Sequence, residues 1–195
     1  MLRTGLLGGT FDPLHYGHLL AAEAAREAAD LTEIWLVPSF IPPHKPGPDT
    51  DSKMRLGMLE AAVADIPGYR IEPIEFARQG VSYTIDTVTD LTRRHPDREF
   101  YWIVGSDMAN DLPNWREPEA LASLVTFIAL ERPDAPLDED KLPAYIRSKL
   151  VRAPMPRIGL SSTDIRKRCR EGRSIRFMTP DPVYEWIRRH RLYEY

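Results

Sequence analysis

Hydrophobic residues along the chain form short runs that alternate with stretches in which they recur every three or four positions. Short apolar runs are typical of buried strands, and the longer periodic stretches are typical of helices with one apolar face. The pattern predicts strands over residues 2–7, 33–38, 69–74, 100–104 and 124–130, of which the third is the weakest. It predicts helices over about 17–29, 51–65, 82–95, 160–172 and 180–191.

The first strand, the first helix and the second strand form one unit, which predicts a parallel strand pair with a right-handed crossover. Repetition of this alternation predicts an α/β fold, namely a Rossmann-like, doubly wound and mainly parallel sheet with helices on both faces. The length of 195 residues suits a single domain over 1–195, with a small helical part at about 160–195.

Composition and charge exclude several classes of protein. A net charge of -3 gives no general attraction to nucleic acid or to an anionic membrane. No apolar run approaches the roughly 20 residues of a membrane-spanning helix, and Asp12, His15 and His18 interrupt any signal-peptide pattern. The one cysteine, Cys169, leaves no internal disulfide and fits a reducing compartment. We therefore expect a cytoplasmic protein.

Candidate chemistry lies at the junction between the first predicted strand and the first predicted helix. Gly8 and Gly9 would let the backbone approach a phosphate, and the amides that open the helix would point at the anion. His15 and His18 lie three residues apart, so both rings can face one ligand and donate to phosphoryl oxygens. The alternatives are a simple turn with structural histidines, or a zinc site that two ligands leave incomplete because Cys169 is remote.

Further candidates follow the later strands. The proline-stiffened loop after the second strand offers His44 and Lys45 as contacts for an anion, or is a solvated loop. After the fourth strand, the carboxylate of Asp107 could hold a ribose hydroxyl group or cap a helix. Trp115 could stack on a flat ring, although most tryptophans are packing residues.

The C-terminal part has a different character, because a hydroxyl-rich helix start precedes a run of basic residues. Ser161, Ser162 and Thr163 open this helix, and Arg166 lies one turn later. A guanidinium group at that position can bind two phosphate oxygens, which suits a polyphosphate. The alternative is a capped surface helix with solvated basic side chains.

These motifs together resemble a known family. Residues 8–18, with the sequence GGTFDPLHYGH, resemble the first signature of the HxGH nucleotidyltransferase superfamily, and residues 161–166, SSTDIR, resemble its second signature. Four shorter motifs then match the bacterial nicotinate-mononucleotide adenylyltransferases in order and spacing: PPHK at 42–45, SYT at 82–84, GSD at 105–107 and NW at 114–115. The similarity spans residues 6–193 and identifies the chain as a member of that family.

The resemblance implies adenylyl transfer from ATP to nicotinate mononucleotide, which gives deamido-NAD and pyrophosphate. It implies that His15, His18 and Arg166 are catalytic, and that Mg²⁺ is bound mainly through ATP phosphates and water, with no metal ligand from the protein. The implied ATP-binding residues are Gly8, Gly9, Thr10, Phe11, His15, His18, Asp107, Ser161, Ser162, Thr163, Ile165 and Arg166. The implied residues for nicotinate mononucleotide are Ser39, His44, Lys45, Thr84, Trp115 and Arg116.

Two positions depart from the family pattern. Ser39 replaces an asparagine of the relatives and Arg116 replaces a common aromatic residue, which concerns substrate affinity and not the type of reaction. Main-chain donors near Thr84 and Arg116 would favour the carboxylate of the nicotinate ring over an amide. This is a hypothesis on substrate choice.

Other functions remain as alternatives. Related transferases act on phosphopantetheine or glycerol phosphate, but Trp115 and the SYT motif argue against them. A nucleotide-binding sensor would keep the phosphate site without turnover, whereas intact His15, His18 and Arg166 favour an enzyme. A metal-dependent hydrolase would need a third ligand. Self-association into a homo-oligomer is compatible with the sequence.

Overall fold

A computed structural model of the chain describes residues 1–43, 47–131 and 136–194. Six strands form one sheet in the order β3-β2-β1-β4-β5-β6, and every neighbouring pair is parallel. The strands are β1 (Leu2–Gly9), β2 (Glu33–Pro38), β3 (Tyr69–Ile71), β4 (Arg98–Gly105), β5 (Val125–Glu131) and β6 (Leu150–Pro154).

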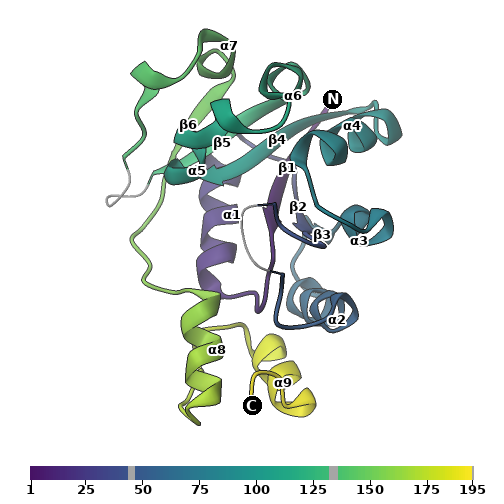
Figure 1. Cartoon of the computed structure of the whole chain (residues 1–195), viewed down its shortest axis with the longest axis vertical. Helices are drawn as coiled ribbons and strands as arrows, with labels where there is room; N and C mark the ends of the chain where they lie inside the picture. Colours follow the sequence, from purple (N-terminus) through teal and green to yellow (C-terminus); the bar gives the residue numbers. More distant parts are fainter. Residues whose placement is uncertain (44–46, 132–135, 195) are drawn as a thin grey trace.

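Helices connect the strands and cover the sheet (Figure 1). The larger helices are α1 (Tyr16–Ala28), α2 (Ser52–Val63), α4 (Thr84–Arg94), α8 (Ser162–Arg170) and α9 (Asp181–His190). The shorter ones are α3 (Ile74–Arg78), α5 (Ser106–Asp111), α6 (Pro118–Leu124) and α7 (Ala144–Arg147), with 3₁₀ turns η1 (Leu112–Asn114) and η2 (Glu139–Lys141). None of the helices in the described ranges has the length and hydrophobicity needed to cross a membrane.

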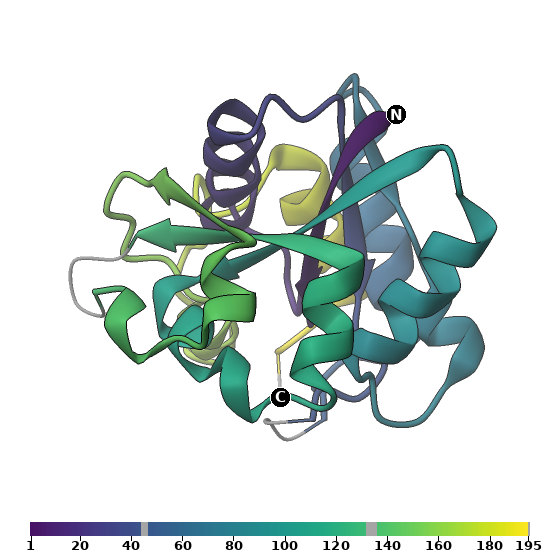
Figure 2. The same cartoon turned by 90° about the horizontal axis from the view of Figure 1, so that it is seen from above.

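Two hydrophobic cores lie on opposite faces of the sheet, because successive side chains of a strand point to opposite sides. Leu36 of β2 belongs to the core that also contains residues of α1, α2 and α9, whereas Trp35 belongs to the core with residues of α4 and α6. Figure 2 shows helices on both sides of the sheet. The expected Rossmann-like, doubly wound α/β fold is confirmed.

The order of the strands places a topological switch point at the centre of the sheet. β1 pairs with β2 on one side and with β4 on the other, so the connections leave β1 in opposite directions. In sheets of this kind, ligands bind beyond the carboxyl ends of the two strands where the direction changes. Here those ends are Gly9 and Gly105. The predicted glycine motifs therefore meet at the same edge of the sheet.

The sequence prediction was wrong in a few elements. The third strand ends at Ile71 and not at residue 74, because Pro73 has no N–H group for a strand ladder and Ile74 begins α3 with its side chain buried. The prediction also missed β6, which lies at the edge of the sheet where Arg152 and Pro154 are tolerated. It missed α5, α6 and α7 because helices of four to seven residues show too little periodicity.

The helices α8 and α9 lie together at one end of the molecule, beside the segment that joins β1 to α1 (Figure 1). Contact between α2 and α9 holds this end in place: the Trp186 ring lies against the backbone of Gly57, where a β-carbon would overlap Cζ2 of the ring and lie 2.5 Å from Cη2. Only glycine leaves room for this packing.

Replacing Gly57 with alanine tests the contact between α2 and α9. We expect Gly57→Ala to lower the free energy of unfolding by about 1–3 kcal/mol, because an added methyl group forces the indole ring to move. Gly159→Ala is the matched control, since a β-carbon there has no neighbour within 4 Å. Equilibrium unfolding in urea measures both variants, and equal or higher stability of Gly57→Ala would contradict the packing argument.

Candidate active site

The glycine pair at the end of β1 packs closely against neighbouring aromatic rings. A β-carbon on Gly8 would lie 2.7 Å from Cζ2 of Trp102 on β4, and one on Gly9 would lie 3.0 Å from the ring of Phe11. A β-carbon at Gly8 would force the Trp102 ring to shift, and one at Gly9 would make a tight contact with the Phe11 ring, so the local packing favours glycine at both positions. This is a second reason for the motif, besides the expected approach of a phosphate.

The turn after β1 places Phe11 behind the second histidine. Phe11 has a positive φ of 48° and its side chain is buried. Its ring meets His18 edge-on, with centroids 5.0 Å apart and an interplanar angle of 72°. Phe11, which was expected to bind ATP, thus packs against the ring of His18. Thr10 contributes its carbonyl oxygen to the contacts of this turn.

The two histidines stack on each other at the start of α1. His15 is the N-cap residue, and its ring lies 3.8 Å from the ring of His18 with an interplanar angle of 22°. The backbone N–H of His15 donates to Nδ1 of His18 at 3.2 Å. Neutral His18 therefore carries its proton on Nε2, as a donor. Gly17 is required beside the pair, because a β-carbon would lie 2.9 Å from both Cε1 and Nδ1 of His15.

Burial sets the charge of the first histidine. His15 is 7% exposed, and burial lowers its pKa from 6.5 to about 4, because the buried ring cannot be solvated as an imidazolium. His15 is therefore neutral at pH 7. Its Nδ1 atom has no hydrogen-bond partner among the described residues.

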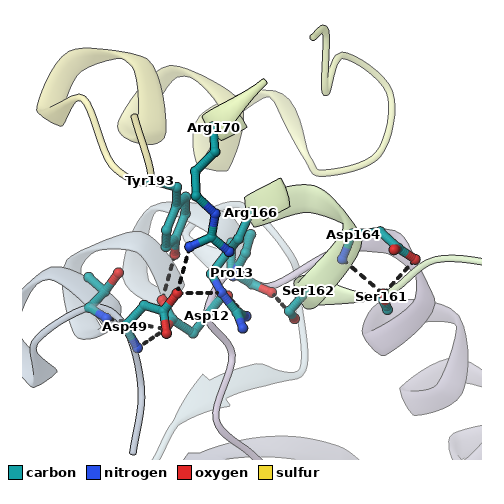
Figure 3. Close-up of polar contacts among 10 residues, drawn as sticks. Asp12, Pro13, Asp49, Ser161, Ser162, Asp164, Arg166, Arg170 and Tyr193 are labelled. Carbon is teal, nitrogen blue, oxygen red and sulfur yellow. Dashed lines mark hydrogen bonds and ion pairs between the residues drawn. The ribbon is translucent and has the colours of Figure 1, made fainter. Parts of the chain in front are cut away.

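The second motif joins the first through two backbone carbonyl groups (Figure 3). Nη1 of Arg166 donates to the carbonyl oxygen of Asp12 at 2.8 Å, and Oγ of Ser162 donates to that of Pro13 at 2.8 Å. Nε of Arg166 donates to Oδ2 of Asp49 at 3.0 Å, and Arg170 lies 3.4 Å from the same oxygen. The structure therefore brings the two motifs together, as expected, although they lie about 150 residues apart.

Two hydroxyl groups of this motif, those of Ser161 and Ser162, form hydrogen bonds within the protein. Ser161 is the N-cap of α8, where its Oγ accepts from the backbone N–H of Asp164 at 3.1 Å and donates to Oδ2 of that residue at 2.8 Å. Ser162 is engaged with Pro13. Thr163 is exposed, and Ile165 is fully buried in the core. Ile165 thus anchors α8, and its side chain is unavailable to a ligand.

Asp12 is a functional residue whose role the sequence did not reveal. Its carboxylate is buried and accepts three hydrogen bonds: from the hydroxyl group of Tyr193 at 2.6 Å, and from the backbone N–H groups of Asp49 at 2.7 Å and Thr50 at 3.2 Å. Tyr193 lies 181 positions away. No pattern in the sequence links Tyr193 to the first motif. Asp12, in contrast, lies within that motif, and its position there was a signal that it belongs to the site.

Arg55 is a second residue that the sequence analysis missed. The guanidinium group is 1% exposed and donates to the carbonyl oxygens of Thr10 at 2.9 Å, Ser39 at 2.7 Å and Thr50 at 3.2 Å. Burial lowers the pKa of Arg55, but an arginine with so high an ordinary value stays charged. Arg55 lies three residues before Met58, on the same face of α2. This spacing was the sequence signal that the arginine is buried. Arg55 fixes the loops that follow β1 and β2.

The loop after β2 contains Ser39, which was expected to contact substrate. Its backbone N–H donates to the carbonyl oxygen of Gly9 at 2.9 Å, and its buried Oγ has no partner among the described residues. The next residue, Phe40, donates its N–H to Oγ of Ser82 at 2.9 Å. The loop is thereby tied to the turn before α4. His44 and Lys45 lie outside the described residues.

A buried carboxylate supports the turn before α4. Glu75 is 4% exposed. Its carboxylate accepts a hydrogen bond from the hydroxyl group of Thr87 at 2.6 Å and another from the hydroxyl group of Ser82. Burial raises the pKa of Glu75, and these two hydrogen bonds oppose the rise. The network fixes the segment that leads to Thr84, the first residue of α4.

Arg116 contacts the residues on either side of Thr84. The guanidinium group of Arg116 lies 4.8 Å from the ring centroid of Tyr83, the residue before Thr84, and 3.7 Å from Oδ2 of Asp86. Trp115 is half-buried and packs against the second core, and its buried Nε1 has no partner among the described residues. Asp107 is exposed in the first turn of α5, at the carboxyl end of β4.

The low pKa of His15 predicts a pH dependence of stability. Above pH 6.5 the ring is neutral in the folded and unfolded states; between 6.5 and about 4 the unfolded chain binds a proton that the folded protein excludes. Stability should therefore fall as the pH falls through this window, by about 3 kcal/mol from this group. His15→Asn removes this component, so urea unfolding at pH 7 and pH 4.5 should show a smaller loss for the variant. Equal losses would contradict the assignment.

Comparison with known proteins places the chain in a family. A family model described as "Cytidylyltransferase-like" matches residues 6–168. The "Probable nicotinate-nucleotide adenylyltransferase" of Geobacillus thermodenitrificans is 44% identical over 194 residues, covering 99% of this chain and 87% of that protein. Its namesake from Bacillus pumilus is 41% identical over 198 residues and covers both chains fully, at 100%.

Solved structures show the same fold. The "Plasmodium falciparum nicotinic acid mononucleotide adenylyltransferase complexed with NaAD" matches with a TM-score of 0.81 at 23% identity, covering 100% of this chain and 98% of that chain. A second structure of that protein, "complexed with APC", matches with a TM-score of 0.79. The stacked histidines, the arginine joined to them through Asp12 and the full-length similarity lead to one conclusion: the chain belongs to the nicotinate-nucleotide adenylyltransferase family.

Proposed function

We propose that the chain transfers the adenylyl group of ATP to nicotinate mononucleotide, producing deamido-NAD and pyrophosphate as a step of NAD biosynthesis. The observation that carries this proposal is the junction of the His15–His18 stack with Arg166 through the Asp12–Pro13 segment. It supplies ring and guanidinium donors at the edge of the sheet where nucleotides bind in such folds. The names of the relatives support the same activity.

The chemistry requires positioning more than proton transfer. The phosphate of nicotinate mononucleotide is ionised at pH 7 and attacks the α-phosphorus of ATP in line, while the bond to pyrophosphate breaks. No general base is needed, so preorganised donors that stabilise charge at the α-phosphate are sufficient. His18 would donate from Nε2, and neutral His15 holds the His18 ring in place by stacking.

Arg166 would stabilise the leaving pyrophosphate. Two of its donors, Nη1 and Nε, are engaged with the Asp12 carbonyl oxygen and with Asp49. The guanidinium group has five N–H donors, so its remaining N–H groups on Nη1 and Nη2 can donate to phosphate oxygens. Asp49 is the partner that a triphosphate would replace, because its carboxylate is partly exposed and holds both Arg166 and Arg170. Gly8, Gly9, Thr10 and Asp107 would line the nucleotide site.

Mg²⁺ would accompany ATP and not occupy a site of its own in the protein. In residues 1–43, 47–131 and 136–194, no group of three or more His, Cys, Asp and Glu side chains is placed to hold a metal ion. We propose that Mg²⁺ is bound through ATP phosphates and water, the manner that suits this ion, and we assign it no step.

The acceptor would bind on the other side of the cleft, among Ser39, Thr84, Trp115 and Arg116, with His44 and Lys45 near its phosphate. The contact of Arg116 with Tyr83 supports a common role for Thr84 and Arg116. Main-chain donors at this place would favour the acid over the amide. We further propose one domain over 1–195 with a helical part at about 160–195, located in the cytoplasm.

A substrate panel tests the reaction and the choice of acceptor. With ATP and magnesium, pyrophosphate release should occur with nicotinate mononucleotide and should be weaker by more than about tenfold in kcat/KM with nicotinamide mononucleotide. Phosphopantetheine should give no turnover. Equal kcat/KM for the acid and the amide would contradict the acid preference. Folded protein that binds ATP and turns over none of the three acceptors would instead be a nucleotide sensor.

A substitution tests the role of His18. We expect His18→Ala to lower kcat by about 10²–10³-fold, because a preorganised donor to the developing charge is lost. His190→Ala is the matched control, since that histidine is exposed at the end of α9. Circular dichroism checks the folding of both variants. Near-normal turnover of folded His18→Ala would assign the residue a structural role only.

A further inference from the structure

The buried hydroxyl group of Tyr193 lies at the end of a chain of contacts that reaches Arg166 (Figure 3). We propose that Tyr193 is a positioning residue for adenylyl transfer: it fixes Asp12, whose carbonyl group in turn holds the guanidinium group of Arg166. The proposal rests on the proposed function, because it assigns to Arg166 the binding of ATP phosphates. It makes the C-terminal segment a part of the active site.

The first step of the argument is the carboxylate of Asp12. This group is 1% exposed, so its oxygens depend on hydrogen bonds from the protein. Tyr193 donates to Oδ1 at 2.6 Å, and the N–H groups of Asp49 and Thr50 donate to Oδ2 at 2.7 and 3.2 Å. Each oxygen is thus held from a different part of the chain.

The second step is the backbone of the same residue. The carbonyl oxygen of Asp12 accepts from Nη1 of Arg166 at 2.8 Å, and the next carbonyl oxygen, that of Pro13, accepts from Ser162. The side chain and the carbonyl group of one residue are linked by the same α-carbon. A shift of the carboxylate therefore turns the carbonyl group, and with it the guanidinium group that it holds.

The third step is the placement of Tyr193. After α9 the chain turns at Arg191, which has a φ of 50°, and the N–H of Leu192 donates to the carbonyl oxygen of Ile187 at 3.0 Å. Tyr193 itself has a φ of 67° and is 1% exposed. This turn buries the last aromatic ring of the described chain and aims its hydroxyl group at Asp12 (Figure 3).

The state of the hydroxyl group suits a permanent donor. Burial and the neighbouring carboxylate of Asp12 both raise the pKa of Tyr193, because a phenolate would be poorly solvated and repelled. The phenol therefore keeps its proton throughout the range in which the protein is folded. A phenylalanine would fill the same space and would leave Oδ1 of Asp12 without this donor.

Kinetics of one pair of variants test the proposal. Tyr193→Phe should lower kcat by about 10- to 100-fold, since small displacements of catalytic groups have effects of this size. It should also raise KM for ATP, with KM for nicotinate mononucleotide little changed. Tyr184→Phe is the matched control, because it removes a phenol hydroxyl group on α9 outside the Asp12 cluster. Unchanged kcat in folded Tyr193→Phe would overturn the proposal.

A double-mutant cycle separates positioning from general stabilisation. If Tyr193 acts through Arg166, the effect of Tyr193→Phe on kcat should largely disappear in an Arg166→Lys background, because that background has already lost the arginine fork. A purely structural role predicts the same loss of kcat in both backgrounds. Additive effects would therefore contradict the proposal even if each single variant is impaired.

A measurement without turnover keeps this proposal distinct from the proposed function. The Nε–H signal of Arg166 in a ¹H–¹⁵N spectrum, assigned with Arg166→Lys, should be sharp in the wild type and in Tyr184→Phe. It should broaden or vanish in Tyr193→Phe. Asp12→Asn, a second variant that disturbs the same link, should have the same effect. A sharp signal in folded Asp12→Asn or in folded Tyr193→Phe would overturn the proposed positioning of Arg166 by Tyr193. An inactive wild type that gives the expected spectra would contradict only the proposed function.

Discussion

Polar groups from distant parts of the chain form hydrogen bonds with the segment between β1 and α1. The candidate site depends on these hydrogen bonds. Arg55 of α2 binds the carbonyl oxygen of Thr10, and Arg166 of α8 binds that of Asp12. Tyr193 holds the carboxylate of Asp12 from the C-terminal segment. Buried polar groups are costly when left unpaired. The folding of three separate elements is therefore coupled to one turn that presents the histidines.

This arrangement explains how a site with a neutral, buried His15 can act on highly charged substrates. His15 is too buried to be protonated at pH 7, and it supports the donor function of His18 by stacking and through its backbone N–H. Positive charge comes from Arg166 and Arg170, which share Asp49. Donors fixed before the substrate arrives need no reorganisation during the reaction, which is the main advantage of such a site.

Much of the fold and part of the site could be predicted from the sequence. Long periodic elements such as α1 and α4 could be predicted because the local pattern of apolar residues determines them. β6 and α5 were missed because they are too short or too polar to show such a pattern. The sequence predicts site roles for His18 and Arg166 because histidines three residues apart and an arginine one turn into a helix suit phosphate chemistry. Tyr193 was not predicted, because its role depends on a contact between residues 181 positions apart. Nor could the sequence show that the hydroxyl groups of Ser161 and Ser162 form hydrogen bonds within the protein.

A crystal structure with a non-hydrolysable ATP analogue and magnesium tests the central claim most directly. The account predicts phosphate oxygens within hydrogen-bond distance of Nε2 of His18 and of the guanidinium group of Arg166, with Asp49 displaced from that group. The Tyr193–Asp12 contact should be retained. Phosphates bound at another edge of the sheet, with the Arg166–Asp49 pair intact and His18 without a ligand contact, would contradict the account.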